Sequence, residues 1–420
     1  ILFVVDGVPN APFSMSDVET VTVLKDAASA AIYGATVGSG GVIVITTKRS
    51  QSGKAKVNFN AYQGVSVVGS LPGTLTSEQY NEVWAKAVAD KSPGSTATLP
   101  TVADPSKYQY GNVTRTNWME EIFRSAHQQH YDLSVTGGTD VLKALTSVSY
   151  DKNEGTLLNT YKESLNAKLD VDFQLNKWLK LTERASFQYS NGQGNVNNQS
   201  HEGVIINALF YPRSATIYEY DKQGTQLYDT FGRARYGGTI PQYYAEQGIS
   251  GYGEIRNPVA TLNRLRQHRP SATIFSTTGL EYKPISGLTV KTDFTASLSS
   301  SRYEYFNPKI PEIGLPRNEN ERYVSSTWGN TWLWESTIAY NTELADKHSI
   351  STLAGYTMFR ENNRFTATSV YEFDREDEHS TIFPSGSNWS KTRPQETIWD
   401  ESTISAFARI GYSYDDRYFM

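Results

Sequence analysis

The sequence predicts an all-β membrane protein, in which a large antiparallel transmembrane β-barrel follows a small α/β unit. Three observations support this fold class. Apolar and polar residues alternate in long segments from Val57 onward, the connections between segments are alternately long and short, and tyrosines lie near segment ends. Alternation turns one apolar face toward lipid, and outer-membrane barrels combine short turns on one side with long loops on the other.

The composition excludes several other classes of protein. The 420 residues include 39 Lys and Arg against 44 Asp and Glu, a net charge of -5, which disfavours nucleic-acid binding. The chain contains no cysteine, which excludes disulfide frameworks, thiolate metal sites and cysteine nucleophiles. The longest apolar run, Ile1–Val5, is far shorter than the about 20 residues of a transmembrane helix.

Residues 1–50 predict the small α/β unit. A β-branched run at Val21–Leu24 is followed by Asp26, which can cap a helix. The Ala-rich segment Ala27–Tyr33 favours a helix that ends at Gly34. The continuous apolar run Val42–Thr47 is typical of a strand buried on both faces.

Glycines in this unit predict turns rather than a phosphate-binding loop. Asp6 and Gly7 predict a turn after the first strand. Gly38 and Gly41 follow the predicted helix and have no neighbouring Lys, whereas the glycines of a phosphate-binding loop precede its helix. The polar stretch 51–56 then predicts a hinge before the barrel.

Ten segments with period-two alternation follow the hinge. In one of them, Leu165, Leu169 and Phe173 lie on the face opposite to Lys168 and Asp170. The segments have about 10 to 15 residues, whereas strands of soluble domains usually have about 5 or 6. The ten strands are expected near residues 57–68, 128–137, 141–152, 161–175, 178–190, 271–283, 288–301, 327–341, 348–360 and 400–414.

The connections between these strands indicate the orientation in the membrane. Each strand crosses the membrane once, so every second connection emerges on the same side. Longer and shorter connections alternate without exception. We therefore expect the long connections 191–270, 302–326 and 361–399 to be extracellular, and the short connections 176–177, 284–287 and 342–347 to be periplasmic.

Aromatic residues fit the borders of a membrane-spanning sheet. Aromatic girdles mark both interfaces of an outer-membrane barrel. Trp328, Trp332 and Trp334 have even spacing and are expected on the lipid-facing side of one strand. The tyrosines near strand ends are Tyr150, Tyr189, Tyr282, Tyr303, Tyr340, Tyr356 and Tyr414.

Both ends of the sequence lie inside predicted strands. The chain opens in the apolar run Ile1–Val5, and its last residues, Tyr418–Met420, resemble the start of a strand. Ten strands and this stub leave an unpaired edge that lipid does not tolerate. The chain is therefore expected to be an internal piece of a longer protein, with more strands after it.

Several segments resemble the SusC/RagA group of TonB-dependent outer-membrane transporters. DVETVTVLKDAASAAIYGATVGSGGVIVITTKR at Asp17–Arg49 and VVDGVP at Val4–Pro9 resemble the plug-domain signature of that group. TNWMEEIF at Thr116–Phe123 and DLSVTGG at Asp132–Gly138 are similar to its first barrel strands. The signature positions in this sequence are Asp6, Gly7, Lys25, Asp26, Tyr33, Gly34 and Gly41.

The resemblance implies a 22-stranded barrel in the bacterial outer membrane with a plug domain in its lumen. Residues 1–50 then form the C-terminal part of the plug, residues 51–56 the hinge, and residues 57–420 the first part of the barrel. It also implies energy from a TonB complex and a SusD-like surface lipoprotein as a lid. A dimer of such transporter–lipoprotein pairs is an open alternative, and no cofactor is implied.

The largest candidate binding surface is the long connection 191–270. Aromatic rings stack on sugars, and Arg, Asn and Gln donate to hydroxyls, although the same residues also suit a peptide, a partner protein or packing within the loop. The candidate substrate-binding residues are Tyr211, Arg213, Tyr218, Tyr236, Tyr243, Tyr244, Tyr252 and Arg256. The same loop also contains Tyr220, Tyr228, Phe231, Arg233 and Arg235.

Metal sites and catalytic motifs are not favoured. His127 and His130 are three apart on a predicted strand, so they face opposite sides and cannot bind one ion together. The acidic residues Glu372, Asp374 and Asp377 allow a calcium site as an alternative, but they lack the spaced pattern of a calcium loop, and a solvated loop is favoured. No metalloprotease or serine-hydrolase motif occurs in the sequence.

The leading functional hypothesis is TonB-dependent import of oligosaccharides, with a peptide importer of the same group as the alternative. A β-rich surface protein that binds glycans without transport is the competing hypothesis from another class. A glycan-cleaving enzyme ranks third, since no clear pair of catalytic carboxylates is visible.

Overall fold

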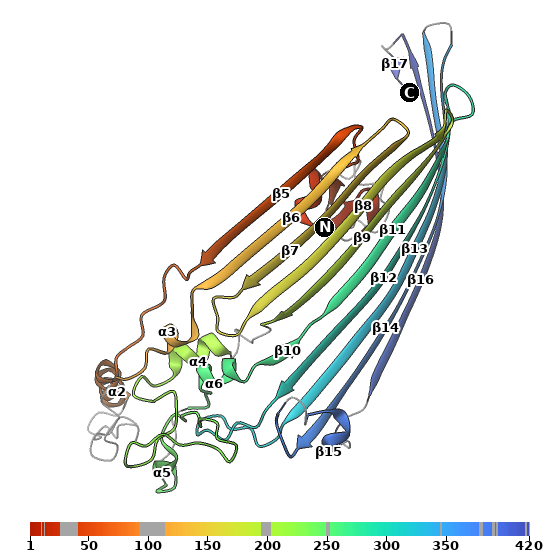
Figure 1. Cartoon of the computed structure of the whole chain (residues 1–420). Coiled ribbons are helices and arrows are strands. Elements are labelled where there is room, and N and C mark those ends of the chain that lie inside the picture. The colour runs from red at the N-terminus through yellow and green to blue at the C-terminus, as the bar shows by residue number, and fades with distance from the viewer. Residues whose placement is uncertain are drawn as a thin grey trace.

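The structure is a computed structural model. It describes residues 1–9, 11, 13–25, 41–91, 114–194, 203–248, 253–344, 347–377, 381–388, 391, 394–415 and 418–419. These residues form two sheets and several loop helices (Figure 1). Among the described helices, none has the length and apolar character needed to cross a membrane.

The larger sheet is an antiparallel wall in which the long strands are neighbours in chain order. All ten predicted strands are confirmed, and the expected stub is present as β17 (Tyr418–Phe419). Two short strands were not predicted: β10 (Arg266–His268) pairs with β12, and β15 (Gly386–Asn388) pairs with β14. The long strands are β5 (Gly53–Ser66), β6 (Ala126–Gly138), β7 (Leu142–Glu154), β8 (Tyr161–Asn176), β9 (Leu179–Gln193), β11 (Ser271–Tyr282), β12 (Leu288–Asn307), β13 (Glu321–Leu344), β14 (His348–Phe373) and β16 (Gln395–Tyr414).

The two faces of the wall differ as the alternation predicts. On β8, Leu165 and Leu169 are exposed, whereas Lys168 and Asp170 are buried against the N-terminal segment. We call the face of Asp170 the inner face and the face of Leu169 the outer face. The register carries the inner face from Asp170 to Arg184 on the next strand, and onward across the wall.

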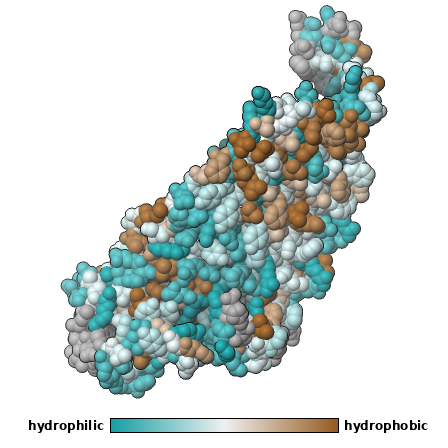
Figure 2. All heavy atoms as spheres, in the orientation of Figure 1, coloured by the Kyte–Doolittle hydropathy of each residue, from teal (hydrophilic) through white to brown (hydrophobic). Residues whose placement is uncertain are grey.

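The outer face contains an apolar band of membrane thickness. On β13, Trp328, Trp334 and Tyr340 are exposed on this face, as predicted for the even positions. Residues 328 to 340 extend about 40 Å along the strand, and a tilt of about 45° reduces this to about 28 Å, close to the about 25 Å band of outer-membrane barrels. Figure 2 shows the apolar residues gathered mainly over the half of the sheet nearer the C-terminal end.

Four strands extend beyond this band, so the predicted loops 302–326 and 361–399 are partly wrong. β12 and β13 continue pairing through Tyr305 and Tyr323, and β14 and β16 pair as far as Ala367 and Gln395. The extensions are mainly polar and aromatic, and their few aliphatic residues, Val324, Ala367, Val370 and Ile398, do not form a regular lipid-facing alternation. The connections that remain, 139–141, 155–160, 177–178, 194–270, 283–287, 308–320, 345–347 and 374–394, still alternate between short and long.

The N-terminal residues form a separate four-stranded sheet in the order β2-β1-β4-β3. Its elements are β1 (Leu2–Val5), β2 (Val8–Pro9), the 3₁₀ turn η1 (Met15–Asp17), β3 (Val18–Leu24) and β4 (Val42–Thr47). β4 is central, since it pairs parallel with β1 and antiparallel with β3, and Val42 and Ile45 are buried. The predicted helix Ala27–Tyr33, with its cap Asp26, lies outside the described residues.

Two predicted turns in this region have different outcomes. Asp6 and Gly7 have positive φ angles of 51° and 92° and form a two-residue hairpin turn, which confirms the predicted turn. β5 begins at Gly53, inside the segment 51–56 that was expected as a hinge, and pairs there with Gly138. A register irregularity between Gly53 and Lys56 follows from this early start. The hinge itself stays a prediction.

The long connections contain short helices that gather at one end of the wall, opposite to the short turns (Figure 1). Three of them, at 118–122, 204–210 and 258–263, pack into a core of their own, in which Trp118, Ile122, Val204 and Leu262 are fully buried. This core gives the connections a fixed shape rather than that of independent loops. The helices are α2 (Ser77–Lys91), α3 (Trp118–Ile122), α4 (Val204–Phe210), α5 (Gln242–Ala245), α6 (Pro258–Asn263) and the 3₁₀ turn η3 (Phe383–Ser385).

Candidate functional site

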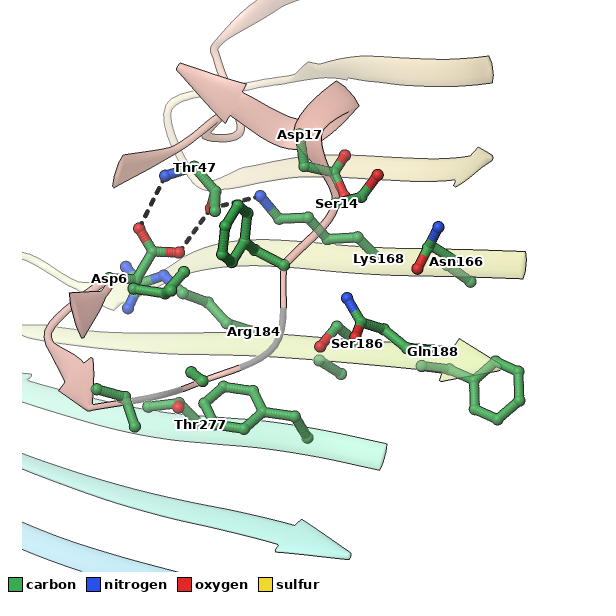
Figure 3. A pocket seen from close by; sticks show the side chains of 18 residues that line it. Asp6, Ser14, Asp17, Thr47, Asn166, Lys168, Arg184, Ser186, Gln188 and Thr277 are labelled. Atoms are coloured by element: carbon green, nitrogen blue, oxygen red, sulfur yellow. Dashed lines mark hydrogen bonds between the residues drawn. The ribbon is translucent and has the colours of Figure 1, made fainter. Parts of the chain in front are cut away.

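Hydrogen bonds and ion pairs connect the N-terminal sheet to the inner face of the wall (Figure 3). Asp170 of β8 has a side chain only 1% exposed. Its Oδ1 accepts a hydrogen bond from the backbone N–H of Ser50 at 3.0 Å. Its Oδ2 accepts from Arg49 Nη1 and from Arg184 Nε, each at 3.3 Å. One carboxylate therefore joins the end of the N-terminal sheet to two strands of the wall.

A second group of contacts centres on Thr47 at the end of β4. Asp6 Oδ1 accepts from the Thr47 backbone N–H at 3.0 Å, and Asp6 Oδ2 accepts from the Thr47 hydroxyl at 2.6 Å. Lys168 Nζ donates to that hydroxyl at 2.6 Å and to the carbonyl of Lys48 at 2.8 Å. Arg49 Nη2 donates to Asp6 Oδ1 at 2.8 Å. Asp6 thus stabilises the segment that contacts the wall.

The plug-signature positions have structural roles where the structure describes them. Gly41 has a φ of +76°, and a Cβ there would lie 2.8 Å from the carbonyl oxygen of Leu24, so glycine is required. Lys25 follows β3 directly. The signature positions Asp26, Tyr33 and Gly34 lie outside the described residues.

A cavity of about 850 Å³ lies among the long connections. Its walls come from four segments, 218–242, 263–266, 308–320 and 373–377. Tyr218 and Tyr236 stack within it, with ring centroids 5.5 Å apart and planes at 27°. The Arg264 guanidinium lies 4.9 Å from the centre of the Tyr236 ring. The cavity therefore offers an aromatic wall beside charged groups, a combination that suits a sugar or a peptide.

Three extended segments hold this aromatic wall in place. The backbone N–H of Leu227 donates to the carbonyl of Glu219, that of Arg235 donates to Leu227, and that of Glu219 donates to Arg235. The three bonds close a ring. Tyr218 and Tyr236 form an antiparallel bridge next to it. The side chains of this region are thus presented on a fixed backbone.

Most charges around the cavity are paired within the protein. Arg264 forms a bidentate ion pair with Glu312, with Nη1 to Oε2 at 2.9 Å. Arg233 Nε donates to Asp229 at 2.7 Å. Glu219 is buried and accepts from the backbone N–H of Gln242 at 2.8 Å. Burial raises the pKa of Glu219 above its ordinary value of 4.5, and the nearby Arg235 charge opposes this shift.

The structure separates the predicted substrate-binding residues into groups. Tyr218 and Tyr236 line the cavity. Tyr211 is buried in the loop core against Trp118, and Arg213 donates to the carbonyls of Thr116 and Thr74, so these two support the fold of the loops. Their contact with substrate stays a prediction. The buried position of Tyr211 follows from helix α4, which ends next to it.

The other four predicted residues lie away from the main cavity or outside the described chain. Tyr243 lines a smaller cavity of about 210 Å³, and Tyr244 packs beside it with ring centroids 4.5 Å apart. Arg256 donates to the carbonyl of Leu315 and lines a third cavity of about 110 Å³. Tyr252 lies outside the described residues. Contact of substrate with Tyr243, Tyr244 or Arg256 stays a prediction.

Sequence reasoning missed Glu219, Arg264, Glu312 and Glu376, because the cavity combines segments far apart in the chain. One sequence pattern in this region could have indicated its local structure. Tyr-Asp-x-x-Gly occurs at Tyr220–Gly224 and again eight residues later at Tyr228–Gly232, with Tyr236 at the next repeat. Asp221 and Asp229 each accept backbone N–H groups two and four residues later, so the repeat produces two equal turns.

The histidine and acidic candidates have partners of their own. His130 Nδ1 lies 2.7 Å from Asp151 Oδ1, and its ring stacks on Tyr62. Glu372 accepts from Ser387 and Asn388, and Asp377 pairs with Arg375 at 3.1 Å. In the part of the chain that the structure describes, no three acidic or histidine side chains are arranged to hold a metal ion.

Comparison with known proteins finds relatives among TonB-dependent receptors. The TonB-dependent receptor P26 of Formosa agariphila is 24% identical over 441 residues, which cover 100% of this chain and 40% of the receptor. The TonB-dependent receptor SusC of Bacteroides thetaiotaomicron is 32% identical over 161 residues, which cover 37% of this chain and 14% of SusC. The chain is similar over its whole length to TonB-dependent receptors, and over 161 residues to SusC. No family model matches it.

The solved structures agree with this family on the fold. The RagAB peptide importer in its closed-closed state matches with a TM-score of 0.77 at 20% identity, over 99% of this chain and 47% of that chain. The long-stranded sheet of this SusC/RagA-like chain is thus the wall of a transmembrane β-barrel of the bacterial outer membrane. The chain spans about two-fifths of the length of the curated relative P26.

Proposed function

We propose that the protein containing this SusC/RagA-like chain imports oligosaccharides across the outer membrane with energy from a TonB complex. In this proposal residues 1–50 are the C-terminal part of a plug, residues 51–56 include the hinge, and residues 57–420 are the first part of the barrel. A SusD-like lipoprotein covers the loop end, where the cavity lies.

The contact between the N-terminal sheet and the wall supports transport rather than simple binding. A purely apolar interface would hold the sheet permanently, whereas hydrogen bonds of Asp170, Lys168 and Arg49 are readily replaced by water when the sheet moves. Arg49 and Arg184 are 31% and 24% exposed, so water already reaches part of this interface. A docked sheet with a wettable interface suits a plug that is displaced by an applied force.

A peptide importer is the second candidate function. The structural match to RagAB, described as a peptide importer, favours it at the level of the fold. The cavity also combines paired cationic and anionic groups with the stacked rings of Tyr218 and Tyr236, which suits a peptide as well as a glycan.

Uptake in cells with and without TonB activity tests the proposal. The complete transporter and its lipoprotein are expressed together, and labelled oligosaccharides and labelled peptides are supplied in parallel. We expect uptake of one class to stop without TonB activity, while binding at the cell surface persists. Uptake that continues at the same rate without TonB activity contradicts active import and indicates a passive pore.

A further inference from the structure

One half-buried cation in the loop cavity differs from its neighbours. Arg235 lines the cavity and is half-buried, yet its guanidinium makes no hydrogen bond or ion pair within the described part of the chain. Lys309 lines the same cavity and also has no side-chain partner among the described residues, but it is exposed to solvent. Arg264 and Arg233 are paired with Glu312 and Asp229. Arg266 donates to the carbonyl of Glu376 and lies 4.3 Å from the centre of the Phe306 ring.

The backbone of Arg235 is fixed although its side chain has no partner. Its N–H donates to the carbonyl of Leu227 at 3.0 Å, and its carbonyl accepts from Glu219 at 2.9 Å. Its neighbour Tyr236 belongs to the stacked pair with Tyr218. The guanidinium is therefore presented from a rigid segment beside an aromatic wall, which reduces the entropy lost when a ligand binds.

None of the described acidic side chains that line the cavity forms an ion pair with Arg235. Glu219 is satisfied by backbone N–H groups, including that of Gln242, and is not within ion-pair distance of Arg235. Glu376 accepts from the backbone N–H of Lys309 and from Asn320. Asp374 also lines the cavity, but it is exposed to solvent.

We propose that Arg235 binds a carboxylate of the transported oligomer, with the adjacent ring of that oligomer or an apolar side chain against Tyr218 and Tyr236. This inference rests on the proposed function and restricts its substrate to an acidic class. A guanidinium binds a carboxylate through two parallel hydrogen bonds, a geometry that an ammonium group does not reproduce. The carboxylate belongs either to a uronic acid of a glycan or to the C-terminus of a peptide.

Binding by the complete transporter, purified in detergent, tests this inference. The glycan probes are oligogalacturonides and the same oligomers with their carboxyl groups reduced to alcohols. The peptide probes are short apolar peptides with a free or an amidated C-terminus. The variants are Arg235→Gln and Arg235→Lys, and the matched control is Arg233→Gln, which also lines the cavity but is paired with Asp229.

We expect one acidic probe to bind wild-type protein about tenfold or more tightly than its neutral analogue. Arg235→Gln removes that preference, Arg235→Lys keeps part of it, and Arg233→Gln changes it less than about twofold. The acidic probe that binds identifies the source of the carboxylate. Unchanged hydrogen exchange over residues 217–237 shows that the Arg235 variants keep their fold.

Three results overturn the inference: equal affinity for acidic and neutral probes, unchanged affinity in Arg235→Gln, or no binding of either acidic probe. These results leave the proposed function intact when TonB-dependent uptake of neutral oligosaccharides is observed. Loss of TonB dependence, in contrast, contradicts the proposed function whatever Arg235 binds.

Discussion

Removing the carboxylate of Asp170 tests how the N-terminal sheet is held against the wall. In Asp170→Ala, the backbone N–H of Ser50 and the guanidinium groups of Arg49 and Arg184 each lose one hydrogen-bond acceptor. The vacated site is almost completely buried, so water replaces the lost acceptor poorly at Ser50. The Asp6 and Thr47 contacts of the same interface remain.

The size of the effect follows from these three bonds. A hydrogen bond to a charged group contributes about 1.5–3 kcal/mol. Two of the three donors are guanidinium groups that are 31% and 24% exposed, and solvent compensates part of their loss. We expect the docking of the sheet to weaken by about 2–4 kcal/mol, which corresponds to about a 30-fold to 1,000-fold larger population of the undocked state.

Hydrogen exchange of the peptides that cover residues 42–50 measures this population in the purified protein. Asp172→Ala is the matched control, because Asp172 lies on the same face of β8 and pairs with Lys180 at 2.7 Å. We expect fast exchange over 42–50 in Asp170→Ala and exchange within about twofold of wild type in Asp172→Ala. Equal exchange in Asp170→Ala and wild type refutes the role assigned to Asp170.

Two further predictions concern the loop cavity and the outer face. Burial raises the pKa of Glu219, so its charged form destabilises the folded loop above that pKa, and this penalty is relieved as pH falls through the raised pKa. The protection factors of residues 217–220, which correct for the intrinsic pH dependence of amide exchange, should therefore rise between pH 7 and about pH 5 in wild type but not in Glu219→Gln. Trp334→Arg places a charge on the lipid-facing side and should destabilise the folded barrel by about 2–4 kcal/mol in urea titrations from lipid bilayers, whereas Thr331→Arg on the inner face should cost less than about 1 kcal/mol. Equal protection factors of residues 217–220 at both pH values contradict the role assigned to Glu219, and equal loss of stability in the two Arg variants contradicts the assignment of the outer face.

The strands were predictable from the sequence where one face contacts lipid, because that contact requires apolar residues at alternate positions. On β8, the alternation of Leu165 and Leu169 with Lys168 and Asp170 results directly from lipid on one side and the N-terminal sheet on the other. The extension of β12 through Tyr305 was not predictable in the same way. The sequence Arg-Tyr-Glu-Tyr-Phe at 302–306 alternates charged residues with tyrosines and has no aliphatic residue, so it lacks the apolar face that marks a lipid-facing strand.

The candidate site was predictable only in part. Its aromatic wall, Tyr218 and Tyr236, comes from a single segment, and that composition is visible in the sequence. The pairing of Arg264 with Glu312 joins two separate connections, and no local pattern predicts it. The sequence does not distinguish Tyr211 from Tyr218, because both lie in the same Tyr- and Arg-rich segment. Only the packing of α4 against α3 shows that Tyr211 is buried in the loop core, whereas Tyr218 lines the cavity.

The orientation of the wall is the central claim, because it places the cavity outside the cell and the short turns in the periplasm. The chain contains no cysteine, so single cysteines can be labelled without background from this chain. Gln223 lies in an exposed turn of the long connection, and Ser286 lies in a short connection between β11 and β12. With an impermeant maleimide on intact cells, Gln223→Cys should be labelled and Ser286→Cys should not, although both should react after lysis. Labelling of Ser286→Cys on intact cells, with no labelling of Gln223→Cys, would contradict the orientation and remove the cavity from the surface that meets the substrate.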